Sequence, residues 1–160
     1  MFETKNDLAL KTRKQSIALL NARLADCIDL QTQVKHAHWN VKGPNFIALH
    51  ELFDEINEAV EDYVDEIAER AIQLGGVVQG TARAVAAQSG LSEYPASAVD
   101  GAEHVEALST ALATFGKAAR AGIEEANGFG DLNTADLFTE VSRGIDKWLW
   151  FVEAHGQSKR

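Results

Sequence analysis

The chain has few of the features that build disulfides or membrane spans. Cys27 is the only cysteine among its 160 residues, so no disulfide can form within one chain. No apolar run approaches the roughly 20 residues that a membrane helix needs, and the mostly polar first 15 residues do not resemble a signal peptide. These absences exclude a disulfide-stabilised secreted domain and a membrane protein. They favour the reducing cytoplasm, with Cys27 as a small buried apolar residue.

Basic residues are also scarce. The chain holds 24 acidic and 15 basic residues, which gives a net charge of -9. A protein with this balance attracts cations and repels phosphate backbones. The first 14 residues carry four basic side chains against two acidic ones, and the C-terminus adds Lys159 and Arg160. Such short tails predict that DNA binding is weak or absent, because they would neutralise few phosphate charges.

Helical periodicity, by contrast, covers most of the chain, which we expect to form a single domain over residues 1–160 with short tails at about 1–7 and 156–160. Residues expected to face a core recur at mostly alternating spacings of three and four along four segments: Ile17, Leu20, Leu24, Cys27, Gln31, Val34 and His38; Leu49, Phe53, Ile56, Val60, Tyr63, Ile67 and Leu74; Val105, Leu108, Leu112, Phe115, Ala119, Gly122 and Ala126; and Phe138, Val141, Ile145, Trp148, Val152 and His155. Residues 75–100 form a long connection with a short helical patch at 81–88. The pattern predicts an all-α four-helix bundle with a long crossover between the second and third helices.

Cap and breaker residues set the expected helix ends. The first helix begins near Asn6-Asp7, or at Thr12 with Gln15 completing a capping box. The other expected boundaries are Asn45 and Gly75-Gly76 for the second helix, Asp100 with Glu103 and then Gly128 and Gly130 for the third, and Asn133 or Thr134 for the start of the fourth.

The second helix carries four metal-ligand side chains on the face turned away from its apolar seam. At about 100° per residue, His50, Asp54, Asp65 and Glu69 fall in one sector. They form two i,i+4 pairs whose midpoints are 15 residues apart, which is about 22 Å along a helix. A single ion, with ligand bonds of roughly 2 Å, cannot touch both pairs of one chain.

A second copy of this helix, laid antiparallel across a two-fold axis near residues 59 and 60, would bring each His-Asp pair against the partner's Asp-Glu pair. Ile47 and Ile72 lie on the same face and would supply apolar contact area. His38 would add a second imidazole, although a single histidine at the end of an inward-facing row is more often a hydrogen-bonded core residue. This ligand set suits iron, manganese or zinc. The alternative interpretation is that the acidic residues are solvated surface charge.

Two long motifs give the chain a family resemblance. KHAHWNVKGPNFIALHELFDEI at 35–56 and DEIAERAIQLGG at 65–76 resemble the signature of the Dps family, the small ferritin-like iron-storage proteins of bacteria. Shorter stretches extend the resemblance over nearly the whole chain: SEYP at 92–95, TAD at 134–136 and SRGIDKWLWFVEAH at 142–155.

The resemblance implies a hollow dodecamer in the bacterial cytoplasm, or associated with the nucleoid. Its ferroxidase ligands would be His38, His50 and Asp54 of one subunit with Asp65 and Glu69 of the two-fold mate. Fe2+ would be oxidised there by hydrogen peroxide, in preference to oxygen, and stored as ferric mineral. The resemblance also implies acidic pores at three-fold axes, for which Asp131 and Asp136 are candidates, Asp131 reading equally as a loop or cap residue. Two rival functions are a DNA-compacting protein and a structural helical oligomer that binds no metal or a static zinc.

Overall fold

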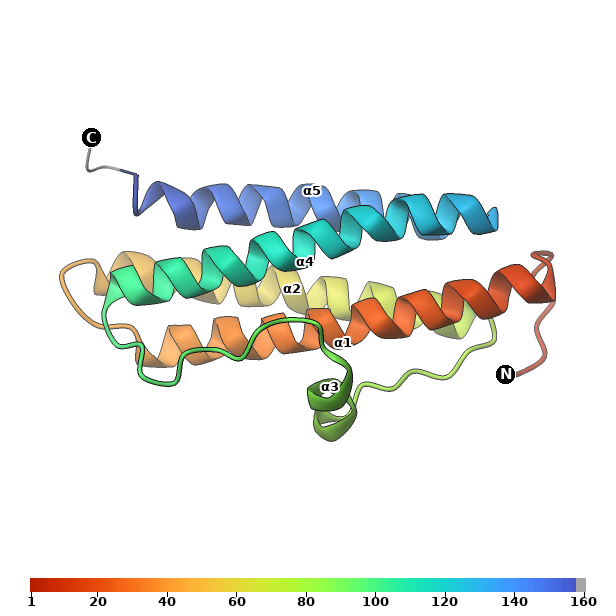
Figure 1. Cartoon of the computed structure of the whole chain (residues 1–160), viewed down its shortest axis with the longest axis horizontal. Coiled ribbons are helices and arrows are strands. Elements are labelled where there is room, and N and C mark those ends of the chain that lie inside the picture. The colour runs from red at the N-terminus through yellow and green to blue at the C-terminus, as the bar shows by residue number, and fades with distance from the viewer. Residues whose placement is uncertain (158–160) are drawn as a thin grey trace.

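The helical periodicity is realised as long helices that pack side by side (Figure 1). The computed structural model describes residues 1–157, and every regular element in that range is helical. The elements are α1 (Leu10–Asn40), α2 (Phe46–Gln73), α3 (Ala82–Gln88), α4 (Gly101–Phe129) and α5 (Leu132–Ala154). The four long helices form the expected bundle, and residues 74–100 run back along it as the crossover, with α3 lying against α1. The predicted all-α bundle is therefore confirmed.

The predicted apolar seams meet in the middle of the bundle. All seven positions expected on α4 are buried, as are six of the seven on α2. Two other expectations were wrong. Gln31 of α1 is only half-buried and Leu30 takes the fully buried position, while His155 lies exposed just beyond the end of α5. Polar side chains at these two positions retain water contact, which burial without a partner would forfeit.

The starts of α1 and α5 differ from the sequence expectation, and the end of α4 matches one of its two expected stop residues. α1 begins at Leu10, because the Thr12 hydroxyl donates to the Phe129 carbonyl of α4 at 2.9 Å and does not cap its own helix. Gly128 lies inside α4, and the helix ends at Gly130 with φ +80°. α5 is capped by Asp131, whose side chain accepts from the Thr134 backbone N–H at 3.1 Å. The Asp100–Glu103 capping box at the start of α4 is confirmed.

Side chains of α1 hold the crossover in place. Asp26, which is buried, accepts from the Gly90 backbone N–H at 2.7 Å. Asp29 accepts from the Ser89 hydroxyl at 2.6 Å, and Gln33 donates to the Ser92 carbonyl at 3.1 Å. This long connection is thus fixed along its length by hydrogen bonds from a single helix.

The N-terminal segment folds back onto the corner where α2 ends. The Phe2 backbone N–H donates to the Gly75 carbonyl at 2.8 Å. Gly75 adopts φ +82°, and a Cβ at that position would lie 2.6 Å from the Phe2 carbonyl oxygen, so a glycine is required there. The expected tail at 1–7 is therefore docked at its start. Of the expected C-terminal tail, residues 158–160, which include Lys159 and Arg160, lie outside the described residues.

The structure bears on two further expectations, one about membrane-spanning helices and one about the burial of Cys27. Within residues 1–157, no helix is both long enough and apolar enough to cross a membrane. Cys27 is fully buried, with its Sγ 3.8 Å from the Val60 carbonyl oxygen. Burial, aided by the charge of Asp26, raises the pKa of this thiol far above its usual value, so the thiol stays protonated and unreactive.

Candidate metal centre

Two of the expected ligands, His38 of α1 and His50 of α2, stack on each other where these helices meet. Their ring centroids are 3.8 Å apart and the ring planes differ by 20°. His38 Nδ1 lies 2.8 Å from the His50 carbonyl oxygen, and His50 Nδ1 lies 2.9 Å from the His38 carbonyl oxygen. Each histidine therefore bonds the backbone of the other, and the pair ties α1 to α2.

These reciprocal bonds determine which nitrogen of each ring is available. A carbonyl oxygen can only accept, so the Nδ1 atoms of His38 and His50 must both carry hydrogen. In the neutral imidazole this leaves the lone pair on Nε2 of both rings. A backbone carbonyl that accepts from the other ring nitrogen is a common support for a metal-binding histidine. The structure therefore presents two oriented imidazole donors side by side.

The carboxylate of Asp54 lies near these rings. Its Oδ1 lies 3.9 Å from His38 Nδ1, and its side chain is 41% exposed. The Lys35 ammonium of α1 forms an ion pair with the same oxygen. This hydrogen bond, with help from the nearby histidines, lowers the pKa of the Asp54 carboxyl, so the group is anionic at neutral pH. Lys35 was not among the predicted site residues, although its position three residues before His38 places it on the same side of α1.

Asp65 and Glu69 are exposed and lie further along α2. Asp65 follows Asp54 by 11 residues, which corresponds to about 16 Å along a helix. One subunit therefore brings His38, His50 and Asp54 together and leaves the Asp-Glu pair apart. In residues 1–157 no three metal-ligand side chains gather closely enough to hold an ion.

The two pore candidates have different environments. Asp136 is exposed on the first turns of α5. Asp131 is 1% exposed, and its carboxylate accepts from Arg70 at 2.8 Å and from the Thr134 hydroxyl at 2.6 Å. A buried, paired carboxylate does not line a water-filled pore, so Asp131 is a cap residue, the alternative that the sequence left open. The pore hypothesis keeps only Asp136.

A further acidic group on α2 and α5 was missed in the sequence. Burial raises the pKa of Glu66, and the neighbouring charges of Glu140, Asp62 and Asp65 add to this effect. These carboxylates repel one another, and a cation bound among them would reduce that repulsion. The spacing of Asp62, Asp65 and Glu66 was visible in the sequence, but the approach of Glu140 from α5 was not.

Known proteins match both the sequence and the fold. A family model described as a ferritin-like domain matches residues 17–159. The DNA protection during starvation protein of Agrobacterium fabrum is 43% identical to this chain over 157 residues, which cover 98% of this chain and 97% of that protein. The chain belongs to the Dps family of ferritin-like proteins. A solved structure of Mycobacterium smegmatis Dps matches this Dps chain with a TM-score of 0.93 and 33% identity, covering 99% of this chain and 90% of that one. DpsA14 from Streptomyces coelicolor matches with a TM-score of 0.92 and 36% identity, covering 98% and 92%.

Membership in the Dps family has a functional consequence. It implies that the chain binds iron, stores it and protects against oxidative damage. The expected family resemblance is thereby confirmed. Family membership alone does not identify the residues that bind the iron. The side-chain geometry described above is the observation that bears on them.

Proposed function

We propose that this Dps protein is a ferroxidase whose metal sites lie between subunits related by a two-fold axis. The observation that carries the proposal is the reciprocal hydrogen bonding of His38 and His50, which leaves the lone pair on Nε2 of both rings. The Asp54 carboxylate lies 3.9 Å from Nδ1 of His38. Hydrogen bonds such as the reciprocal pair orient a metal ligand before the ion arrives. Asp65 and Glu69 of the two-fold mate would supply the remaining oxygen ligands.

The exposed apolar residues of α2 fit this arrangement. Phe46, Ile47 and Ile72 are 39%, 59% and 52% exposed near the two ends of the helix. Burying them against a second copy of the same helix would provide an isologous contact with apolar residues at both ends. The acidic pair at 65 and 69 would then face the imidazole pair of the partner. The full assembly would be the hollow dodecamer expected from the family.

The donor set favours oxidation of the bound iron. Carboxylate oxygens are hard ligands that stabilise Fe3+ relative to Fe2+, while imidazole nitrogens bind either state. Lys35 is paired with Asp54, so its ammonium would compete with Fe2+ for that carboxylate. Hydrogen peroxide would accept two electrons from two ferrous ions and leave as water, without releasing hydroxyl radical. The ferric product would then be stored in the interior.

Anaerobic titration with Fe2+ followed by one addition of peroxide tests this function. We expect saturable Fe2+ binding and then a rapid rise in ferric absorbance. The same titration of a variant with His50→Asn and Asp54→Asn should show neither, since two of the three ligands from one subunit are lost. A protein that binds Zn2+ tightly but gives no ferric signal with iron and peroxide would instead be the structural oligomer with a static metal.

The exposed carboxylate of Asp136 provides a test of the route by which iron enters. Asp136→Asn should slow iron oxidation by roughly two- to tenfold at low ionic strength, because carboxylates along a pore attract cations. Equilibrium Fe2+ binding should not change, because the residue does not belong to the metal centre. Stopped-flow absorbance at low and high salt measures the effect. Equal rates for the variant and the wild type at low salt would remove Asp136 from the uptake route.

A DNA-compacting function is the second candidate, since the Agrobacterium fabrum relative is called a DNA protection during starvation protein. The net charge of -9 and the docked N-terminal segment argue against it. We expect no retained complex with duplex DNA in a gel-shift assay at neutral pH and physiological salt. Replacing Lys5 and Lys11 with glutamine should change nothing in that assay. Retention of DNA at sub-micromolar protein, lost in this double variant, would overturn the expectation.

A further inference from the structure

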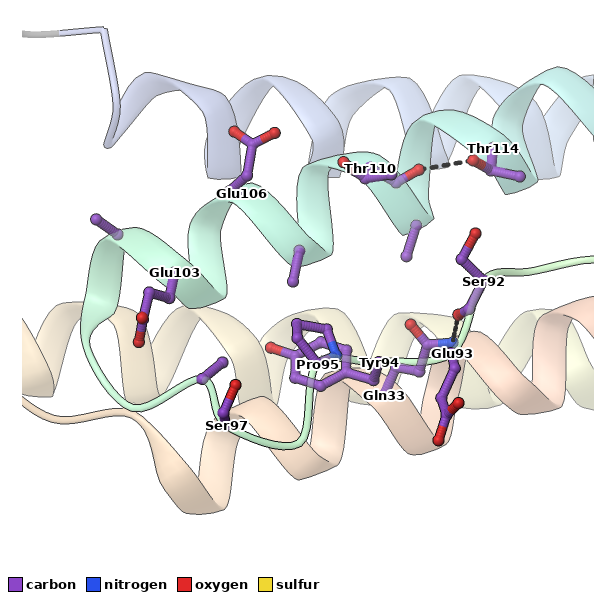
Figure 2. A pocket seen from close by; sticks show the side chains of 14 residues that line it. Gln33, Ser92, Glu93, Tyr94, Pro95, Ser97, Glu103, Glu106, Thr110 and Thr114 are labelled. Carbon is purple, nitrogen blue, oxygen red and sulfur yellow. Dashed lines mark hydrogen bonds between the residues drawn. The ribbon is translucent and has the colours of Figure 1, made fainter.

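A tyrosine and a buried histidine form a close pair outside the metal centre. Tyr94 of the crossover has its phenol oxygen 2.6 Å from Nδ1 of His104, which lies on the first turn of α4. His104 is fully buried, and within residues 1–157 its Nε2 has no hydrogen-bond partner. Figure 2 shows Tyr94 on the crossover segment, in the space between α1 and α4. A histidine that served only to fill the core could be replaced by an apolar residue without leaving a buried nitrogen unpaired.

The direction of this hydrogen bond follows from counting partners. The Tyr94 phenol has no other hydrogen bond in the described part of the chain. If His104 Nδ1 donated, both the phenol hydrogen and the Nε2 lone pair would lack partners; if the phenol donates, only Nε2–H does. Burial, with the charge of His36, lowers the pKa of His104 despite the opposing charges of Glu103 and Asp100. Burial also raises the pKa of Tyr94. At neutral pH the pair is therefore a phenol donating to a neutral imidazole base.

Two ring contacts connect the pair to the helices that carry the candidate metal ligands. On one side, the His36 ring packs edge-on against Tyr94 with centroids 5.2 Å apart, and His36 precedes the ligand His38 by two residues. On the other side, the Phe53 ring lies 6.5 Å from His104, and Phe53 precedes the ligand Asp54. The pair therefore packs against one aromatic side chain of α1 and one of α2, the two helices that supply the candidate ligands.

The Tyr94 side chain also borders two cavities. It is half-buried and lines two cavities, one of about 540 Å³ between the crossover and α4 and one of about 910 Å³ between the crossover, α1 and α3. Figure 2 shows the first of these, with Glu93 and Glu106 among the residues that line it. A reductant the size of ascorbate or a thiol could therefore reach the phenol and return an electron to it.

We propose that Tyr94 and His104 form a proton-coupled redox site that takes up an oxidising equivalent from the metal centre. This role depends on the proposed ferroxidase function. Peroxide needs two electrons; when only one Fe2+ is bound, the ion supplies one and the Tyr94 phenol supplies the other. Fe2+, peroxide and the pair then give Fe3+, two hydroxide ions, a neutral tyrosyl radical and His104 protonated on Nδ1. The phenolic proton moves along the existing hydrogen bond to an adjacent base, which makes loss of the electron easier.

The pair can be tested without iron. Metal-free protein is oxidised by azide radical from pulse radiolysis, and the absorption of a neutral tyrosyl radical is followed. The chain has two tyrosines, so Tyr63→Phe is the matched control and should keep the signal, while Tyr94→Phe should lose it. In His104→Asn the side-chain amide oxygen can still accept from the phenol but cannot take its proton. We expect this variant to lose the long-lived radical while its thermal unfolding stays close to that of the wild type.

A signal that persists in Tyr94→Phe, or is unchanged in a folded His104→Asn, would overturn the proposal, since the hydrogen bond would then be only structural. The second arm loads one Fe2+ per subunit, adds peroxide and freezes the mixture for electron paramagnetic resonance. A tyrosyl radical that is absent in Tyr94→Phe supports the link to the metal centre. Iron oxidation without that radical defeats the link. Failure of iron to oxidise at all defeats the proposed function, and the azide arm still decides whether the pair itself is redox-active.

Discussion

Two inactive variants of this protein are expected to regain iron oxidation when their subunits are mixed. One carries His38→Asn, His50→Asn and Asp54→Asn; the other carries Asp65→Asn and Glu69→Gln. Asparagine is chosen for the histidines because its side-chain N–H can replace Nδ1–H in the reciprocal bonds to the backbone, while the Nε2 ligand is removed. Each variant should assemble, since none of the five side chains is in the buried core, and each should lack rapid ferroxidation.

The amount of recovery follows from the symmetry. In a two-fold dimer with one chain of each kind, one site receives both altered halves and the other receives both intact halves. Random pairing makes about half of the dimers mixed, each with one working site of two, so about a quarter of the wild-type sites should return. Peroxide-driven ferric absorbance after dissociation and reassembly measures this fraction. Each variant dissociated and reassembled alone is the control, and an inactive mixture that has demonstrably reassembled would defeat the shared-site proposal.

The second large effect concerns the corner where α2 meets the start of α5. Asp131→Asn should destabilise the fold by roughly 3–5 kcal/mol, because it leaves the charge of Arg70 unpaired. The Arg70 side chain is 11% exposed and that of Asp131 is 1% exposed, so water cannot compensate for the lost partner. Asparagine keeps the acceptor for the Thr134 N–H, so the loss isolates the ion pair from the helix cap. Thermal unfolding at matched subunit concentration measures the difference, with the exposed Asp136→Asn as the control that should show little change.

The effect of Asp131→Asn should also depend on pH. Burial alone would raise the pKa of the Asp131 carboxyl, but hydrogen bonds from Thr134 and the charge of Arg70 outweigh it, so the pKa lies below its usual value. A lowered pKa stabilises the native state above the unfolded value of about 4, and this contribution disappears as the pH falls through the folded value. The stability difference between the wild type and the variant should therefore be full at neutral pH and shrink in acid. A difference that stays constant into strong acid would show that the carboxylate charge does not contribute.

The sequence predicted what depends on periodicity within one helix. The buried faces of α2 and α4, and the shared face of His50, Asp54, Asp65 and Glu69, follow from residue spacing alone, because a helix repeats every 3.6 residues. Contacts between segments far apart in the chain carry no such signal. The pairing of Arg70 with Asp131 favours a helix-cap role for Asp131 over a pore role. It links residues 61 positions apart. The Thr12 bond to Phe129, which moved the start of α1, spans 117 positions.

In the candidate site, too, the sequence indicated residues that share one helix face but not the contacts between different helices. The sequence predicted His38 as an added ligand and left a hydrogen-bonded core histidine as the alternative. Its reciprocal bond with His50 joins two helices, so residue spacing could not reveal it. The Tyr94–His104 pair was invisible for a related reason. His104 lies one position before the predicted core residue Val105, and only the path of the crossover brings a phenol to it.

Because Cys27 is deeply buried, the folded protein can be labelled at an introduced cysteine without interference from its native thiol. The Cys27 thiol is enclosed between α1 and α2 and stays protonated. Maleimides and other labels that need a thiolate will therefore not react with it in the folded protein. A cysteine introduced on any exposed face will then be the single position that such a reagent modifies. Spin labels, fluorophores or crosslinkers can be attached at the outward surface of α2 without first removing a native residue, and the approach of two copies can be followed directly.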